Sequence, residues 1–388
     1  MSTHPAIFYD RSRVTTDWRC PQSRFLGYEW GGTGLAEETL ALELYTGTVL
    51  HDGLAAIVAG ADIDQIAGAA NEQMKQALLG SGEGTDYDRD TYASEQAALA
   101  EGLLRGYHKH VWPMFRVQYP EVVAIEKELI YNHDMFQGEE VKNQPRFKFM
   151  AKPDLIVRDT EGQLWYVEYK STSSAKDTWV NSWNMAVQLH STIKAVEAEV
   201  GEKVTGVIVQ GLYKGYVSYG KQNSPFCYAY HKPGNPPFTK DLWSYAYAPG
   251  YKKYPVWERP GGVKDWVENM PEDVLTDQFP TSPPIFIKDE LVEAFFRQRA
   301  VRESEIAMAA KAMQNPELSP EIKQEIMDMS FPQRFDQCQP SFGKACQFRR
   351  ICHGNVQDPL AQGFTRRQPH HQPELDAWNA ARAADGAV

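Results

Sequence analysis

The sequence has no long apolar run and no excess of positive charge, and each absence excludes a class of protein. No uninterrupted apolar run approaches the roughly 18 residues that a membrane-spanning helix needs. The opening residues, MSTHPAIFYDRSRV, contain no apolar stretch typical of a signal peptide, so we expect a soluble, cytoplasmic protein. The net charge of −11 argues against a broad electrostatic surface for nucleic acid. Any DNA contact is therefore expected from a local basic patch or from metal-bridged phosphate.

What is present is ordinary globular composition in a long chain. The 388 residues are 42% hydrophobic and 12% aromatic, which argues against disorder. This length suits two or three average domains, or one core with large additions. The patterns divide the chain into an N-terminal segment (1–34), a helical region (35–120), a central core (121–212), a Tyr- and Lys-rich insertion (213–287), a C-terminal helical and cysteine-containing segment (288–354) and a flexible tail (355–388).

The most informative stretch contains two β-type runs. Phe147–Val157 and Leu164–Lys170 flank a turn signal at 159–162, which predicts a hairpin. Asp154 lies near the end of the first run, and the second run carries Glu168 and Lys170, which project together because they are two residues apart. Two carboxylates and a lysine suit a hard divalent cation with a phosphate bound to it. The alternative is a surface hairpin with a solvated ion pair of little energetic value.

Pro153-Asp154, followed after thirteen residues by Glu168-Tyr169-Lys170, resembles the PD-(D/E)XK nuclease signature. Gln188, on the following predicted helix, makes the chain similar to the RecB-like branch of that superfamily. The resemblance implies that Asp154, Glu168 and the Tyr169 backbone carbonyl hold one or two Mg²⁺ or Mn²⁺ ions. It implies that Lys170 positions the nucleophile and that Gln188 contacts the substrate or Lys170. The branch carries a Tyr four positions after this Gln, whereas this chain has Thr192.

A helical pattern over 34–59 places a histidine on an apolar stripe. The stripe consists of Leu40, Leu44, Gly47, His51, Leu54 and Val58. A lone histidine on such a stripe is more often a core residue than a ligand. Gly47-Thr48, two residues and His51, however, resemble the first RecB-like motif, whose histidine is a metal ligand. We therefore expect His51 in the metal site, where imidazole favours Mn²⁺ among the hard divalent ions.

The order of predicted elements indicates an α/β fold. Val122–Tyr131 alternates apolar and polar residues like a half-buried strand, with Glu126 and Glu128 on its polar face, which we expect to be solvated. A helix over Asp177–Val200 and a strand over Val204–Leu212 follow the hairpin. Together these elements fit a restriction-endonuclease-like mixed sheet flanked by helices, with helical insertions.

The cysteines are grouped in an unusual way. Cys338, Cys346 and Cys352 lie within one short segment, and Cys20 is a remote fourth; disulfides are not expected without a secretory signal. Cytosolic thiolate groups bind zinc or iron–sulfur clusters, and the tight C-x-x-C pairs of zinc modules are absent here. One N-terminal and three C-terminal cysteines resemble the iron–sulfur RecB-like nucleases, such as the AddB nuclease domain and the CRISPR-adaptation exonucleases. The resemblance implies a 4Fe-4S cluster, with zinc as the alternative, that clamps both ends around the core. Cys227 is expected to be a free thiol.

The segment 213–260 carries nine of the nineteen tyrosines, and its basic residues outnumber acids by seven to two. Such a mixture suits single-stranded nucleic acid, although an insertion that packs its own tyrosines fits equally well. The resemblance as a whole implies a metal-dependent DNA exonuclease, acting on single-stranded or free-ended DNA in recombination, repair or phage DNA metabolism. The alternatives are a recombination accessory protein that binds DNA with little nuclease activity and a structure-dependent endonuclease, and a protein partner is compatible with all three.

Overall fold

The computed structural model describes residues 6–37, 42–80, 89–133, 146–173, 179–180, 182–183, 187–218, 221–231, 252–339, 345–354, 358–368, 376 and 380. Its α-helices are α1 (Arg11–Arg19), α2 (Pro21–Arg24), α3 (Leu42–Val58), α4 (Ile63–Gly80), α5 (Arg89–Gly106), α6 (Trp112–Gln118), α8 (Val187–Val200), α9 (Gly262–Glu268), α10 (Glu272–Gln278), α11 (Asp289–Gln314), α12 (Pro320–Ser330) and α13 (Arg349–Cys352). Among the described helices, none is both long and apolar enough to cross a membrane.

The strands are β1 (Ile7–Asp10), β2 (Leu35–Glu37), β3 (Glu121–Ile125), β4 (Leu129–His133), β5 (Phe147–Ala151), β6 (Leu155–Arg158), β7 (Leu164–Thr172), β8 (Val204–Tyr213), β9 (Tyr216–Ser218), β10 (Lys221–Asn223), β11 (Tyr228–His231), β12 (Lys252–Pro255) and β13 (Phe364–Arg366). Short 3₁₀ or π-helical turns are η1 (Phe25–Glu29), η2 (Trp30–Gly32), η3 (Tyr107–Val111), η5 (Val256–Glu258), η6 (Phe335–Gln337) and η7 (Pro359–Ala361).

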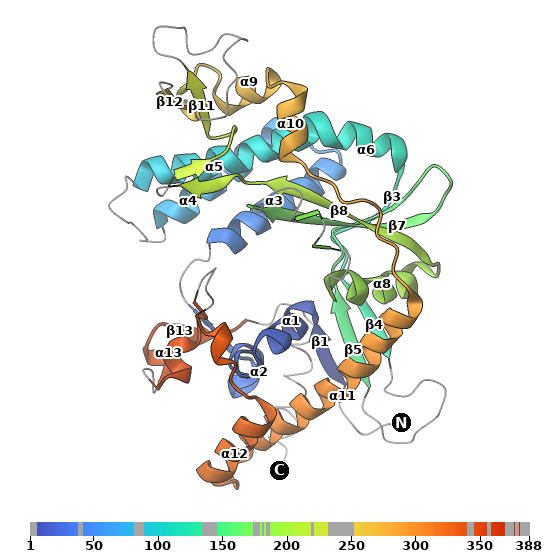
Figure 1. The fold of residues 1–388 in the computed structure, drawn as a ribbon, viewed down its shortest axis with the longest axis vertical. Helices are drawn as coiled ribbons and strands as arrows, with labels where there is room; N and C mark the ends of the chain where they lie inside the picture. The colour runs from blue at the N-terminus through green and yellow to red at the C-terminus, as the bar shows by residue number, and fades with distance from the viewer. Residues whose placement is uncertain are drawn as a thin grey trace.

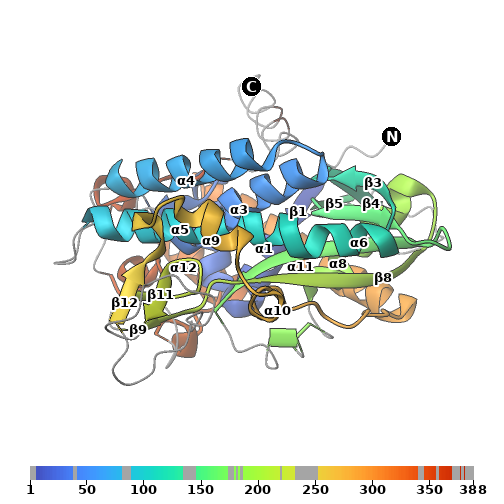
Figure 2. The ribbon, with the colours of Figure 1, turned by 90° about the horizontal axis from the view of Figure 1, so that it is seen from above.

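A four-stranded mixed sheet, in the order β3-β6-β7-β8, forms the centre of the fold. β6 and β7 pair antiparallel, as the predicted hairpin requires. β7 and β8 pair parallel, and the segment that connects them contains α8. Helices α3, α4 and α5 lie side by side above this sheet, and α8 lies below it (Figures 1 and 2). Alternation along β7 sends Trp165, Val167 and Tyr169 toward the upper helices and Tyr166 into a separate core with α8. The mixed sheet between helical layers confirms the predicted restriction-endonuclease-like fold.

A second sheet, in the order β1-β5-β4, lies next to the first and shares two chain segments with it. The run predicted as one strand, Phe147–Val157, is two strands: β5 belongs to the second sheet and β6 to the first. Pro153 lies at the break, because proline has no N–H for a ladder and restricts the residue before it. The predicted strand Val122–Tyr131 is divided in the same way, into β3 and β4, at Glu126 with its φ of 47°. Both single-strand predictions were therefore wrong.

The predicted helix over 34–59 begins later than expected. Residues 35–37 form β2, which pairs with β13, and α3 starts at Leu42. Gly34 has a φ of 84°, and a Cβ there would lie 2.2 Å from the Gly27 carbonyl oxygen, so this turn requires glycine. Leu44, predicted to be on the buried stripe, is 74% exposed, whereas Leu54 is fully buried; Leu40 lies outside the described residues.

Other predictions agree with the structure in whole or in part. The predicted helical region 35–120 contains α3, α4, α5 and α6, and the segment 288–354 contains α11 and α12. The predicted strand Val204–Leu212 is β8. The helix predicted over Asp177–Val200 is described as α8 only from Val187 onward, because Ser182 and Trp183 form a turn; residues 174–178, 181 and 184–186 lie outside the described residues.

The two ends of the described chain form one core. Phe25, Leu26 and Leu35 pack against Ile306 and Phe331, and also against Phe348 and Phe364. This core therefore joins segments that are far apart in the sequence.

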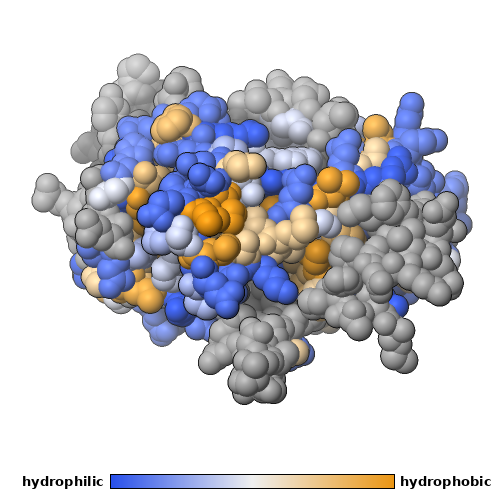
Figure 3. Space-filling view, turned by 90° about the horizontal axis from the view of Figure 1, so that it is seen from below, coloured by the Kyte–Doolittle hydropathy of each residue, from blue (hydrophilic) through white to orange (hydrophobic). Residues whose placement is uncertain are grey.

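Seen from below, the surface is largely hydrophilic, with hydrophobic patches between the polar residues (Figure 3).

A buried ion network joins α1 and α2 to α11. Arg299 contacts Asp17 at 3.0 Å and Glu303 at 2.5 Å, and Arg24 contacts Glu303 at 2.9 Å. Arg302 adds a second partner for Asp17 at 2.9 Å. Asp17, Arg24, Arg299 and Glu303 are each at most 4% exposed. Although burial raises the pKa of Asp17, its bonds to Arg302 and Arg299 lower that pKa below its usual value.

Because Arg299 bonds to two buried acids, its removal leaves Asp17 and Glu303 with one arginine each, and we expect Arg299→Met to lower the free energy of unfolding by about 3 kcal/mol. Arg297→Met is the matched control, because Arg297 is 54% exposed on the same helix and its pair with Glu293 is worth less than about 1 kcal/mol. Urea unfolding followed by tryptophan fluorescence measures both. Equal midpoints for the two variants would contradict the assigned role of the network.

Candidate active site

Asp154 is buried between the two sheets, with both carboxylate oxygens bonded. The Tyr169 backbone N–H donates to Oδ2 at 2.6 Å, and Oδ1 lies 3.0 Å from His51 Nδ1. His51 comes from α3, Tyr169 from β7 and Asp154 from the break between β5 and β6. Three separate elements are thus tied to one carboxylate that is 6% exposed.

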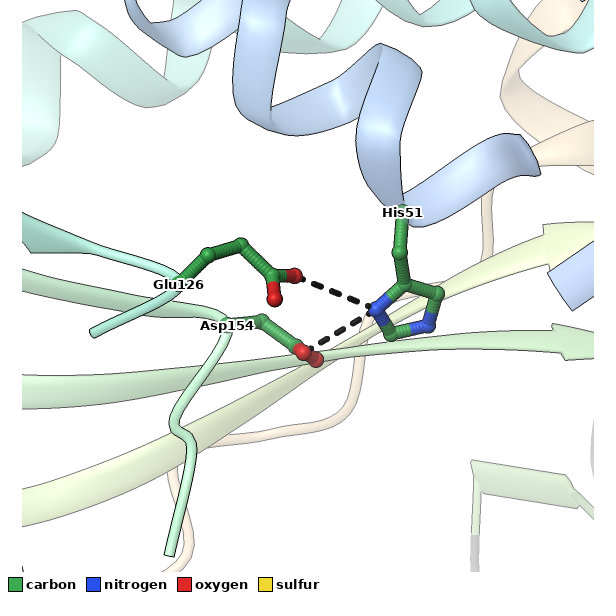
Figure 4. A group of neighbouring side chains, drawn as sticks. All are labelled: His51, Glu126 and Asp154. Atoms are coloured by element: carbon green, nitrogen blue, oxygen red, sulfur yellow. Dashed lines mark hydrogen bonds and ion pairs between the residues drawn. The ribbon is translucent and has the colours of Figure 1, made fainter. Parts of the chain in front are cut away.

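Glu126 is the third member of this group, and it was expected on a solvated strand face. It follows β3 at the strand break, and its N–H donates to the Asp154 carbonyl oxygen at 3.0 Å. Its Oε1 lies 3.5 Å from His51 Nδ1, and its Oε2 lies 2.5 Å from Lys152 Nζ. Figure 4 shows both acids directed at the same imidazole nitrogen. The run of three charged residues at 126–128 is the sequence signal for the break that places Glu126 here.

The two acids set the protonation of His51. Burial lowers the pKa of His51, but its hydrogen bonds to the Asp154 and Glu126 carboxylates outweigh burial and raise the pKa to about 9. Burial and the nearby Glu168 raise the pKa of Asp154. Burial also raises the pKa of Glu126, but His51 and Lys152 bring it below its usual value. Without a metal ion, the imidazole is therefore protonated at neutral pH and supplies positive charge between the acids.

Glu168 and Lys170 project from the same face of β7, as their spacing predicts. Lys170 Nζ contacts Glu168 Oε1, and the same oxygen accepts from Arg11 Nη1 at 2.9 Å. Glu168 is 1% exposed. Burial raises its pKa, yet Lys170 and Arg11 hold the pKa below its usual range, so Glu168 is ionised. Arg11 was not expected in the site, and no local sequence signal marks a contact across 157 positions.

The remaining predicted residues are placed as follows. Gln188 lies in the first turn of α8, but its side chain is outside the described part of the structure. Thr192, which stands where the RecB-like branch carries Tyr, is 4% exposed and lines a cavity with Arg11. The Tyr169 backbone N–H bonds to Asp154, and its side chain points to the opposite face of the sheet from Glu168.

A buried hydrogen-bond chain joins η3 to β7 and β8. The Tyr107 hydroxyl donates to Gln210 Oε1 at 2.8 Å and lies 3.1 Å from the Tyr169 hydroxyl. Tyr107 opens the π-helical turn η3 that follows α5, and such turns are frequent near functional sites. The chain therefore joins the paired residues Tyr169 and Gln210 of β7 and β8 and fixes the register of these strands.

The donor set fits a hard divalent cation. One ligand atom from each of His51, Glu126 and Asp154 lies within 4.8 Å of the others. Carboxylate oxygens are the preferred ligands of Mg²⁺ and Mn²⁺, and an imidazole is compatible with Mn²⁺. Glu168, with its two cationic neighbours, provides a further carboxylate beside this group.

A family model described as the PD-(D/E)XK nuclease superfamily matches residues 12–353. The chain belongs to the PD-(D/E)XK nuclease superfamily. The match spans the four-stranded sheet, strands β4 and β5 of the second sheet and the cysteine segment, and the superfamily assigns to the chain metal-dependent hydrolysis of DNA. A comparison with curated proteins gives no significant match.

The four grouped cysteines come near one another at the junction of the two chain ends. All five cysteines are free thiols. Burial, with a smaller electrostatic contribution from the neighbouring Cys346, Cys20 and Cys338, raises the pKa of Cys352 to about 12. The Cys346 backbone N–H donates to the Cys338 carbonyl at 3.0 Å. Cys227 lies elsewhere, fully buried, where its S–H donates to the Glu95 carbonyl at 3.4 Å.

The raised pKa of His51 has a measurable consequence for metal binding. A histidine must be neutral to ligate a metal, and below pH 9 the His51 imidazole is protonated. We expect Mn²⁺ binding at pH 7.5 to release close to one proton, and the apparent affinity to rise about tenfold per pH unit up to pH 8.5. Calorimetry in buffers of different ionisation heat measures both.

His51→Asn is the matched variant for this experiment. It should release no proton, and its affinity for Mn²⁺ should not change with pH in the same window. Proton release from His51→Asn equal to that of the unmodified chain would show that another group supplies the proton.

Proposed function

We propose that this chain is a RecB-like DNA exonuclease that hydrolyses phosphodiester bonds in single-stranded or free-ended DNA. The observation that carries the proposal is the intact charged set at one place: His51 beside Asp154, with Lys170 on Glu168. A DNA-binding protein with a vestigial site would be expected to lack one of these groups. The split cysteine group adds support, because it resembles the iron–sulfur members of that branch.

The proposed mechanism assigns each side chain a task. His51, Asp154 and Glu126, with Glu168 and the Tyr169 carbonyl, would hold one or two Mg²⁺ or Mn²⁺ ions. When bound, such an ion lowers the pKa of a water molecule and neutralises phosphate charge.

Lys170 Nζ lies at the outer end of this set, where it orients the attacking water and stabilises the charge that develops on phosphorus oxygens. Its side chain is 22% exposed, so it is reachable by a DNA strand. Gln188 is proposed to contact the substrate.

Cys20, Cys338, Cys346 and Cys352 are proposed to hold a 4Fe-4S cluster. The tight C-x-x-C pairs typical of zinc modules are missing from this sequence, which supports the cluster, with zinc as the alternative.

Digestion of end-labelled DNA tests the proposed activity. Linear single strands, linear duplex and covalently closed circles are each incubated with Mn²⁺ or Mg²⁺. We expect cleavage of the linear substrates only, and a loss of at least about 10³-fold in Lys170→Ala, because a group that stabilises the transition state is removed. Lys311→Ala, an exposed lysine of α11, is the control and should retain full activity.

Each of the other outcomes favours a different function for this chain. Cleavage of closed circles would replace the proposal with an endonuclease. Full activity in Lys170→Ala would refute the assigned site, and no metal-dependent cleavage of any substrate would favour the accessory DNA-binding protein.

The cysteine assignment predicts a brown protein after anaerobic purification and a lower melting temperature for Cys346→Ala. A cluster that joins both chain ends contributes its binding free energy to folding, so its loss should destabilise the whole chain. Cys227→Ala is the control, because it removes a buried thiol outside the group and should keep the colour. A colourless, zinc-containing protein would support the zinc alternative, and an unchanged melting curve for Cys346→Ala would contradict a structural cluster.

A further inference from the structure

A cavity of about 320 Å³ opens between the start of α1 and β5. Its apolar side is formed by Phe149–Ala151 of β5. Its polar side is formed by Arg11, Ser12, Lys152 and Thr192. The proposed mechanism uses none of these side chains.

The cavity borders the catalytic carboxylates directly, because each of its two cations bonds to one of them. Arg11 Nη1 lies 2.9 Å from Glu168 Oε1, and Lys152 Nζ lies 2.5 Å from Glu126 Oε2. The two side chains are also 37% and 44% exposed, so both reach solvent as well as the site. A ligand in the cavity would meet positive charge on the side facing the reacting groups.

Two acids also line the cavity. Asp10 caps α1, where its carboxylate accepts from the Arg13 N–H at 2.8 Å, so its charge is satisfied by the helix. Glu128 is exposed in the loop that precedes β4. The two cations are therefore the lining groups that bond to acids of the site, and Asp10 and Glu128 line the same cavity.

The size and chemistry of the cavity select the class of ligand. Its volume is at the lower end of small-molecule sites, which begin at about 300 Å³, and it suits one nucleotide better than an extended strand. A guanidinium binds phosphate oxygens through a planar fork of donors.

We propose that this cavity holds the terminal nucleotide of the DNA strand, and that Arg11 binds its terminal phosphate. The inference rests on the proposed exonuclease function and gives it a physical basis. A strand end fits the cavity, whereas a continuous strand would have to pass through it. Arg11 acts as a specificity residue that selects a phosphorylated end.

The test compares oligonucleotides that carry a phosphate or a hydroxyl at each end. We expect the unmodified enzyme to have a kcat/KM between about tenfold and 100-fold higher for a phosphate at the end where digestion begins, the value of a charged hydrogen bond. In Arg11→Gln this ratio should fall to about one, and in Arg11→Lys it should be intermediate.

Arg19→Gln is the matched control, because Arg19 is exposed about 12 Å further along the same helix and the charge change is identical. It should keep the full ratio. The ratio compares two substrates within one variant, so a general loss of activity through Glu168 does not affect it. If Arg11→Gln is inactive on every substrate, the ratios of Arg11→Lys and Lys152→Gln decide, and unchanged ratios in both overturn the inference.

Two failures remain distinguishable. Cleavage of linear DNA with equal kcat/KM for phosphorylated and hydroxyl ends would overturn the cavity assignment and leave the exonuclease function standing. Absence of cleavage by the unmodified enzyme would remove the proposed function and the cavity assignment together.

Discussion

The buried carboxylate of Asp154 is the constraint on which the arrangement of the site depends. A carboxylate removed from water is stable only when its oxygens are bonded, and here the donors come from the backbone of β7 and from His51 of α3. The acid therefore fixes the position of the hairpin relative to the helical layer above it. Its two bonds also explain why three elements far apart in the sequence meet at one point, with Glu126 held against them by its own N–H.

The two sheets diverge at this same level. One segment leaves β3 for β4 at Glu126, and another leaves β5 for β6 at Pro153-Asp154. Each break releases a carboxylate from regular pairing and directs it at the imidazole, so the group formed by His51, Glu126 and Asp154 results from the division of the chain between the two sheets. Tyr107, Tyr169 and Gln210 hold the undivided strands beneath it in register. The uninterrupted β7–β8 pair thus forms the regular part of the site. Glu126 and Asp154, at the two strand breaks, supply its acids.

The sequence was informative where the chemistry is local and silent where it is not. Glu168 and Lys170 share a face because of strand geometry alone, and the hairpin of β6 and β7 follows from its turn residues. The strand breaks were missed because alternation continues across them, although Pro153 and the charged run at 126–128 marked them. Arg11 could not have been predicted, since its contact with Glu168 depends on how β1 pairs with β5. Leu44 was misassigned because periodicity identifies the apolar stripe of a helix but does not show how far along the helix other elements pack against it.

The ion network between α1 and α11 also dictates when the molecule can be completed during synthesis. Asp17 and Arg299 are 282 positions apart, and a ribosome adding about 5 to 20 residues per second takes roughly 15 to 60 seconds to cover that distance. Until α11 has been synthesised, Asp17 lacks the two arginines that compensate its charge in the folded protein, so we expect this carboxylate to stay in water. The junction between α1 and α11 is therefore expected to form only after most of the chain has been synthesised.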